Sequence, residues 1–383
     1  MREPLAPVNR LRAGAAAALP SALSILLSLA VCFLALAITR RDLEMPLVAY
    51  GQMFAGGLGD FPLFAETGRW TALTRPWGES AAKASLLLLT GLSVAVGFTA
   101  GLFNIGAQGQ MIAGAIAAAI VGAQVALPGG VHPVAALAAA ACAGGLYGLV
   151  PALLKIERGV HEVISTIMLN WIAASLVENW LVVGPLRAHS AAGTSISGTD
   201  QILPSAELPR ILGEASRLHA GLPLALALAI GTWVWLGRTR LGFEVRAVGL
   251  AQEAARTAGI SVGRRICEAM TCAGALAGLA GGVLVLGTEY KFPATLGAPY
   301  GFDGIAVALI GRNHPLGVAA ASIFFGVLRA GGTRMQLLGV HKSFPELIQG
   351  LALLLVAGRL GWEVVLRWRA RPALSRRPEV RDA

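Results

Sequence analysis

The chain has 383 residues, of which 55% are hydrophobic and only 14% are charged. This composition excludes a soluble globular protein, which needs more polar surface than these residues supply. The formal net charge of +10 indicates attraction to the anionic lipid of a membrane, and we expect no nucleic-acid partner.

Ten apolar runs approach the roughly 20 helical residues that cross the hydrocarbon core of a bilayer. They lie near residues 19–38, 84–100, 111–127, 133–154, 163–183, 221–236, 267–288, 302–311, 316–330 and 344–358. Lipid does not tolerate unpaired backbone groups, and the runs lack the apolar/polar alternation of a membrane β-barrel. We therefore predict an all-α integral membrane protein with about ten transmembrane helices, two of them broken or short.

The first apolar run follows Arg2, Arg10 and Arg12 and ends with the A-x-A triplet 35–37. The triplet also fits a secretory signal, but a length of about twenty residues favours an anchor that stays uncleaved. Basic residues near a membrane favour its cytoplasmic side, so we expect the N-terminus there.

Basic residues also cluster in 238–265 and in 359–381, and an even number of spans places these clusters on the same side as the N-terminus. The expected organisation is a cytoplasmic N-terminus (1–18), one transmembrane domain (19–358), extracellular loops (39–83 and 184–220), a cytoplasmic loop (237–266) and a basic cytoplasmic tail (359–383).

Motifs for nucleotide hydrolysis and other enzyme chemistry are missing from the sequence. No G-x-x-x-x-G-K-[ST] phosphate loop, H-E-x-x-H or G-x-S-x-G occurs, and the four cysteines lack metal-ligand spacing. We therefore expect a chain that is not an enzyme and that binds no metal or cofactor of its own.

Polar residues enter the membrane first in GLFNIGAQGQMIAGA, residues 101–115, which contains Asn104, Gln108 and Gln110. Amides at membrane depth are costly, so they usually face a bundle interior or an aqueous cavity. The glycines in this stretch also weaken a helix. We predict a broken or tightly packed helix here, and a broken helix would border a passage through the membrane.

Two further places repeat this pattern. Thr166 and Asn170 are four residues apart and share a helix face. In 298–317, a short apolar segment that includes Phe302 and Asp303 is bracketed by Gly and Pro, and short or interrupted segments of this kind point to a midplane site.

Helix packing and helix capping can also account for these residues. Amides such as Asn104 and Asn170 often join helices without touching a substrate, and Asp303 can cap the short helix that follows it. Small residues four apart form ladders for which helix packing is the better explanation: Gly144 and Gly148, and Gly274, Gly278 and Gly282.

The loop 237–266 contains EAARTAGI, residues 253–260. One interpretation is a solvated amphipathic helix in which Glu253 and Arg256 form an i,i+3 pair. In that interpretation, the glycine at 259 is a helix stop.

Five motifs in order resemble the permease subunits of ATP-binding cassette importers, in the family of ribose-type sugar and branched-chain amino acid permeases, nucleoside-type subgroup. The resemblance covers about residues 80 to 360. The motifs are GLFNIGAQGQMIAGA, HEVISTIMLNWIA (161–173), RAVGLAQEAARTAGIS (246–261), YGFDGIAVALIGRNHPLG (300–317) and LRAGGTRMQ (328–336).

The resemblance implies a multi-pass protein of the cell inner membrane with three kinds of partner: a cytoplasmic ATPase that binds ATP and Mg²⁺, a second permease subunit, identical or not, and an extracellular or periplasmic substrate-binding protein. It assigns docking on the ATPase to Glu253, Ala254, Ala255 and Gly259.

The neutral, amide-rich segments favour a cargo of nucleosides or related neutral sugars. At position 108, Gln stands where the nucleoside pattern usually has Glu, which removes a charge near the predicted pathway. Two alternatives are a simple-sugar permease of the ribose type and an ion-coupled carrier that works alone.

Overall fold

The computed structural model describes residues 7–188, 198–213, 215–293 and 299–369, with the side chains of 22–356 and 358 outside the gaps between these ranges. Within this part, helices make up the fold and there is no strand, only an isolated bridge between Arg210 and His219. The basic ends 1–6 and 370–383, and therefore parts of the predicted cytoplasmic termini, lie outside it.

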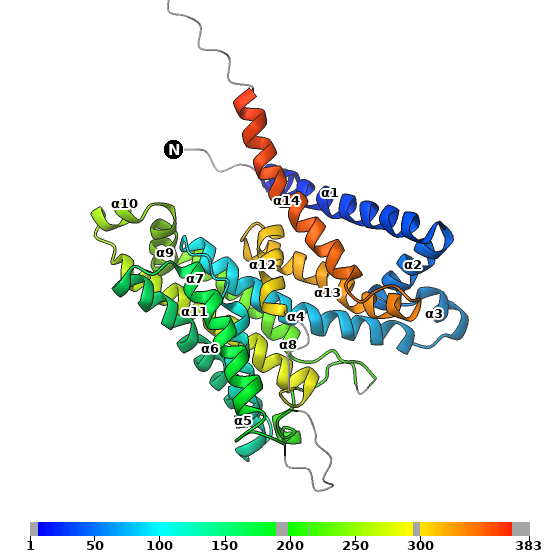
Figure 1. Ribbon diagram of the computed structural model, residues 1–383, viewed down its shortest axis with the longest axis horizontal. Helices are drawn as coiled ribbons and strands as arrows, with labels where there is room; N and C mark the ends of the chain where they lie inside the picture. The colour runs from blue at the N-terminus through cyan, green and yellow to red at the C-terminus, as the bar shows by residue number, and fades with distance from the viewer. Residues whose placement is uncertain (1–6, 189–197, 214, 294–298, 370–383) are drawn as a thin grey trace, which may run out of the picture.

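The main helices follow one another along the chain as shown in Figure 1. They are α1 (Pro7–Arg40), α2 (Glu44–Leu58), α3 (Phe61–Thr67), α4 (Thr71–Thr99), α5 (Ala107–Gln124), α6 (Val131–Arg158), α7 (Glu162–Leu176), α8 (Gly221–Arg238), α9 (Arg240–Leu250), α10 (Gln252–Thr257), α11 (Val262–Leu284), α12 (Tyr300–Ile310), α13 (Pro315–Leu337) and α14 (Phe344–Arg369). The described part also contains two π-helical segments, η1 (Val177–Leu181) and η3 (Val285–Glu289), and one 3₁₀ helix, η2 (Pro204–Ala206).

Each of the ten apolar runs forms helix, which confirms the all-α prediction for the described residues. Six helical stretches are long and apolar enough to cross a membrane: Ala22–Arg40, Thr71–Thr99, Val131–Arg158, Gly221–Arg238, Val262–Glu289 and Pro315–Leu337. α12 has only 11 residues, about 16 Å of helix, or half of a bilayer core. The short helix predicted at 302–311 is therefore confirmed, while ten crossings stay a prediction.

The segment 39–83 is mostly helical, where the sequence predicted one long connection. It contains α2, α3 and the first three turns of α4. The Asp60 carboxylate caps α3 by accepting the Leu63 amide at 3.2 Å, and it also pairs with Arg334 of α13 at 2.9 Å. α2 and α3 are thereby held against the bundle.

The centre of the fold is formed by α4, α5, α6 and α11. Of these helices, α4 and α11 contain the longest runs of buried residues. The predicted glycine ladders pack here. A Cβ added at Gly144 of α6 would lie 2.6 Å from the Cα of Gly278 of α11, so these helices meet backbone to backbone.

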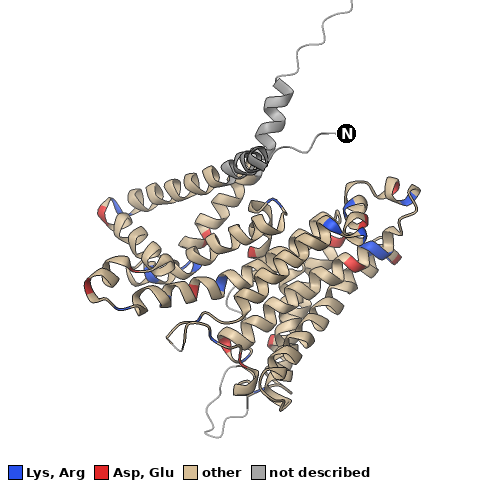
Figure 2. Ribbon diagram, turned by 180° about the vertical axis from the view of Figure 1, so that it is seen from behind, with Lys and Arg blue, Asp and Glu red and all other residues tan. Residues whose placement is uncertain are grey.

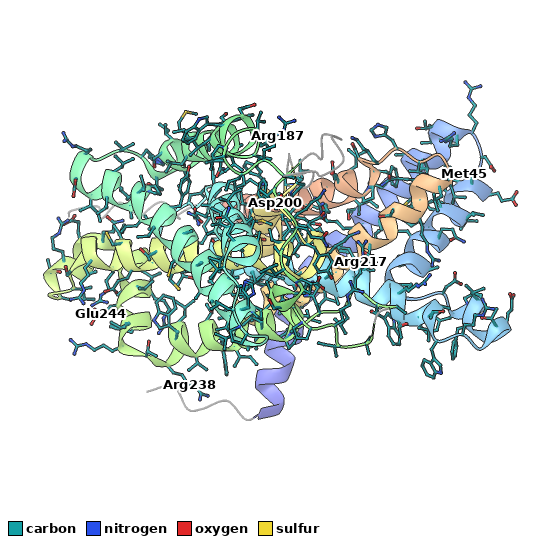
Figure 3. All side chains as sticks on the ribbon, turned by 90° about the horizontal axis from the view of Figure 1, so that it is seen from below. Met45, Arg187, Asp200, Arg217, Arg238 and Glu244 are labelled. Atoms are coloured by element: carbon teal, nitrogen blue, oxygen red, sulfur yellow. The ribbon has the colours of Figure 1, made fainter. Side chains whose placement is uncertain are left out.

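Helices at the periphery are less buried than those at the centre. α1 and α14 lie side by side at one edge of the molecule (Figure 1). Charged residues are sparse along the helices and gather towards their ends, notably around α9 and α10 (Figure 2). Figure 3 places Glu244 of α9 at one end of the molecule and Met45 of α2 at the other. We call the first of these the α10 end.

Candidate functional site

The helical course is interrupted between α4 and α5, at residues 100–106. Gly101 has a φ of +74°, in the left-handed region that glycine adopts without steric cost. Leu102 and Asn104 are buried, so this irregular segment lies inside the protein. The broken helix predicted at Asn104 is confirmed, and we call residues 100–106 the break.

Asn104 and Gln110 face each other at the break and exchange two hydrogen bonds. Asn104 Nδ2 donates to Gln110 Oε1 over 3.0 Å, and Gln110 Nε2 donates to Asn104 Oδ1 over 3.1 Å. Asn104 also donates to Ser93 Oγ of α4 at 3.2 Å and accepts the Gly106 amide at 3.1 Å. Because both amides are 1% exposed, these bonds replace the water that irregular backbone and buried amides would otherwise need.

Asn170 and Thr166 of α7 pack against the same segment. Asn170 accepts a hydrogen bond from the Gly109 amide at 2.8 Å and donates to the Ile105 carbonyl at 2.9 Å. Thr166 is fully buried, and its hydroxyl donates to the Glu162 carbonyl of its own helix at 2.7 Å. The spacing of four residues does place both side chains on one buried face.

Gln108 connects α5 to α12. Its Oε1 accepts the Gly301 amide at 2.8 Å and so satisfies one of the free backbone donors at the start of that helix. A side chain at Gly301 would overlap the backbone of Ala107 and Gln108. α12 therefore touches α5 directly where the two predicted irregular segments meet.

Asp303 lies inside the first turn of α12 and forms an ion pair with Arg329 of α13. The idea that Asp303 caps this helix is wrong, because α12 begins at Tyr300 and its N-cap is Pro299. Phe302 is 43% exposed and lies apart from the amide network.

In this conformation the predicted pathway amides hold α4, α5, α7 and α12 together. Each of Asn104, Gln108, Gln110 and Asn170 has a hydrogen-bond partner within the protein. This arrangement agrees with the alternative in which amides join helices. Contact between these side chains and cargo stays a prediction, and it requires some of these hydrogen bonds to exchange during transport.

EAARTAGI forms α10 and the turn that follows it. The Gly259 φ is +79° and its amide donates to the Arg256 carbonyl at 3.0 Å, so Gly259 ends the helix as predicted. Glu253 pairs with Arg256 at 3.2 Å, and its side chain is 82% exposed. The expected i,i+3 pair is therefore present.

The two alanines of this motif face opposite ways. Ala254 is exposed, whereas Ala255 is 4% exposed and packs against the apolar core of the chain. Only Glu253, Ala254 and Gly259 of the four predicted docking residues therefore present an accessible surface.

An ion-pair clamp between α9 and α11 was missed by sequence reasoning. Arg265 of α11 pairs with Glu244 of α9 at 2.8 Å and with Glu268 of its own helix, and Arg240 pairs with Glu244 at 3.0 Å. The i,i+3 spacing of Arg265 and Glu268 was a usable signal. The pair with Glu244, 21 residues away, has no such periodic signature.

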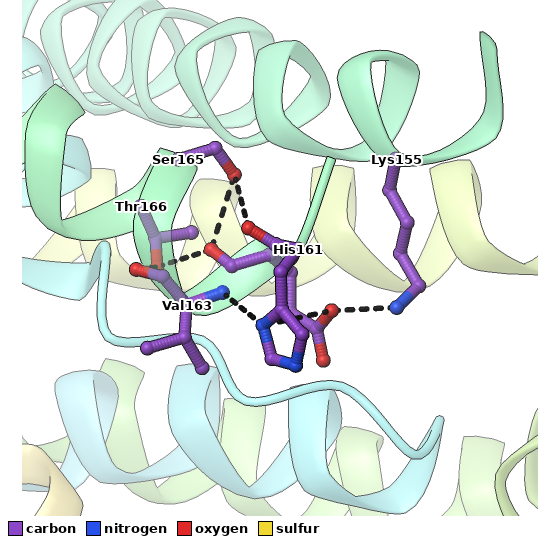
Figure 4. A network of polar contacts seen from close by, with 6 residues as sticks. Lys155, His161, Val163, Ser165 and Thr166 are labelled. Carbon is purple, nitrogen blue, oxygen red and sulfur yellow. Dashed lines mark hydrogen bonds and ion pairs between the residues drawn. The ribbon is translucent and has the colours of Figure 1, made fainter. Parts of the chain in front are cut away.

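A second missed network joins α6 to α7 at the same α10 end. Lys155 pairs with Glu162 at 2.5 Å, and His161 caps α7 by accepting the Val163 amide at 3.3 Å (Figure 4). Glu162 is 7% exposed. The network fixes the start of the helix that carries Thr166 and Asn170.

Comparison with known proteins decides the class of this chain. Residues 78–357 match the family described as the branched-chain amino acid transport system permease component. The chain belongs to this permease family. The match covers every element of the break, the amide network and α10, so these features lie in the part of the permease that the family shares.

Three relatives resemble the permease over most of its length. It is 40% identical to the guanosine ABC transporter permease protein NupP of Bacillus subtilis, over 73% of this chain and 80% of that protein. Identity is 34% with the glucose ABC transporter permease protein TsgB13 of Haloferax volcanii, over 93% and 90%. It is 30% with the nucleoside ABC transporter permease protein NupB of Lactococcus lactis, over 84% and 86%.

Proposed function

We propose that this permease is the membrane subunit of an ATP-binding cassette importer for nucleosides, located in the bacterial inner membrane. The observation that supports the cargo best is the 40% identity with a guanosine permease. The 34% identity with a glucose permease over 93% of the chain supports a neutral sugar as the second candidate. Uncharged polyhydroxylated cargo also suits the neutral amides of the break.

The proposed link to ATP is α10. It is an exposed, short helix at the end of the molecule where charged residues gather (Figure 2), and it lies in the chain between α9 and α11, which the Arg265–Glu244 pair holds together. Because α9 and α11 are held together, a partner that displaces α10 can also displace these two helices. We assign docking on a cytoplasmic ATPase, which binds ATP and Mg²⁺, to Glu253, Ala254 and Gly259.

The remaining assembly is proposed on the same basis. A second permease subunit, identical or paralogous, completes the passage, and a substrate-binding protein delivers cargo at the end opposite α10. We propose that α10 and both ends of the chain lie in the cytoplasm, as the distribution of basic charge in the sequence predicts. Asn104, Gln108, Gln110, Thr166, Asn170, Phe302 and Asp303 are proposed to border the passage.

Reconstitution tests this function. The permease is placed in liposomes with the proposed ATPase, second permease and binding protein, and uptake of guanosine, cytidine, ribose, glucose and leucine is measured in parallel. We expect nucleoside uptake that requires ATP and every partner. Uptake by the permease alone, driven by an ion gradient, would instead establish the ion-coupled carrier.

A further inference from the structure

A cavity of about 390 Å³ opens between the first half of α4, the second half of α13 and η3. Its volume lies within the range of small-molecule sites. Charged residues of both signs line it, which is unusual within helices of this apolar character: Arg75, Glu79, Lys83, Arg217, Glu289 and Arg334. Arg217 lies on the loop before α8, between the two ends of the molecule (Figure 3).

Some of these charges are already neutralised within the protein. Arg334 pairs with Asp60 at 2.9 Å, and Arg217 pairs with Glu79 at 3.2 Å. The Lys83 ammonium donates to the Arg329 carbonyl at 3.2 Å. Arg75, Lys83 and Glu289 have no ion-pair partner among the described residues. The cavity therefore presents a strong donor and a strong acceptor that the fold itself leaves available.

An aromatic ring completes the wall. Tyr300, the first residue of α12, lines the cavity, and the Arg329 guanidinium lies 5.0 Å from the centroid of its ring. The next residue, Gly301, is bonded to Gln108. The backbone beside Tyr300 is thus anchored and Arg329 lies over one face of the ring, so the other face is the surface on which a planar heterocycle can stack.

We propose that this cavity binds the solute during its passage and that its ligand is a nucleoside. This inference rests on the proposed function and gives it a site. A ribose diol can donate to the Glu289 carboxylate, a base carbonyl or ring nitrogen can accept from Lys83, and the base can lie against Tyr300. The cavity is lined by four basic and two acidic residues, and ion pairs with Glu79 and Asp60 neutralise two of the basic ones, so a neutral nucleoside can use Lys83 and Glu289 as hydrogen-bond partners.

The lining also argues against a branched aliphatic cargo. The apolar side chains that line the cavity are small except for Leu86. An aliphatic group placed beside Lys83 and Glu289 would displace water from both charged groups. It could not replace the hydrogen bonds that this water makes to them. Hydroxyl and amide groups of a nucleoside replace those bonds.

The experiment compares ligand and residue together in the complete reconstituted importer, with the binding protein loaded to saturation so that its own selectivity is excluded. Uptake of guanosine and 2′,3′-dideoxyguanosine is measured for the wild type, Glu289→Gln and Lys83→Met. Glu66→Gln and Lys342→Gln are the matched controls, because both positions are exposed and lie outside the cavity.

We expect the wild type to carry guanosine about tenfold faster than the dideoxy compound, the effect of one or two lost hydrogen bonds. In Glu289→Gln this preference should shrink to less than about threefold, and Lys83→Met should slow both compounds equally. Thr333→Val, a change in the part of the lining that α13 contributes, replaces Glu289→Gln if that variant fails to assemble. Stimulation of ATP hydrolysis by the loaded binding protein should persist in every variant.

Two results would overturn the proposal, and they are distinguishable. Guanosine uptake with an unchanged dideoxy preference in the assembled cavity variants would leave the nucleoside importer intact and remove the cavity as its site. Uptake of glucose or leucine and of no nucleoside by the wild type would refute the proposed cargo and, with it, the ligand assigned to the cavity.

Discussion

Gly249, at the end of α9, lies directly on the break beside Gly101. A Cβ on Gly249 would lie 2.8 Å from the Gly101 amide nitrogen and 2.9 Å from the Ala100 carbonyl carbon. The two backbones touch at this point, three residues before α10 begins at Gln252. The helix that leads into the docking segment is therefore in contact with the break that holds the amide network.

A methyl group at Gly249 should loosen this junction. We expect Gly249→Ala to reduce uptake several-fold more than ATP hydrolysis, because α10 would still dock while its displacement reached the break poorly. The ratio of solute carried to ATP hydrolysed is the measurement. Gly231→Ala is the control, because nothing lies within 4 Å of a Cβ added there. An unchanged ratio in Gly249→Ala would mean that the contact has no role in coupling.

The two alanines of α10 should respond differently to substitution. Arg in place of the exposed Ala254 adds bulk and charge on the accessible surface, so we expect loss of ATPase copurification and of uptake while the permease folds normally. Arg in place of the buried Ala255 should reduce folded yield instead. Ala215→Arg, on an exposed loop position, controls for added charge. Normal copurification and transport by Ala254→Arg would leave α10 as a solvated helix.

The amide pair gives a prediction about stability. Asn104→Ala leaves the side chain of buried Gln110 without its partner, which should cost about 1–3 kcal/mol and slow transport while ATPase docking remains. The double variant Asn104→Ala/Gln110→Leu removes both polar groups and should recover part of the lost thermal stability. A single variant with wild-type melting temperature and transport would show that the pair is dispensable.

His219 predicts a loss of stability in acid. It is 1% exposed, its Nδ1 accepts the Gly221 amide at 3.1 Å, and burial, with a smaller contribution from Arg210, lowers its pKa from 6.5 to about 4. The unfolded chain therefore binds this proton more tightly than the folded one. The corresponding stability is present above pH 6.5 and is lost as the pH falls towards 4, by up to about 3 kcal/mol.

Thermal unfolding in detergent at several pH values between 4 and 7 measures this effect. His219→Asn keeps a hydrogen-bond acceptor but does not titrate in this range. We expect its melting temperature to fall less steeply with acid than that of the wild type. If the melting temperatures of the two proteins fell equally with pH, other groups would cause the acid sensitivity.

The sequence by itself determined the class of fold and the places where it is irregular. Apolar runs of bilayer length leave helix as the structure that satisfies every backbone group in lipid, and each run proved helical. Glycine and proline have local effects, so the break at Asn104, the short α12 and the helix stop at Gly259 were all predictable. The order of motifs likewise indicated the permease family.

Only the tertiary structure decided what the polar residues contact. The partners of Asn104 and Gln110 are near in sequence, but Gln108 bonds to Gly301, 193 positions away, and Arg265 pairs with Glu244 on another helix. Such contacts depend on how helices pack, and spacing along one helix carries no information about them. The same reason explains why Ala255 turned out buried and why Lys83 and Glu289, 206 residues apart in the sequence, line one cavity.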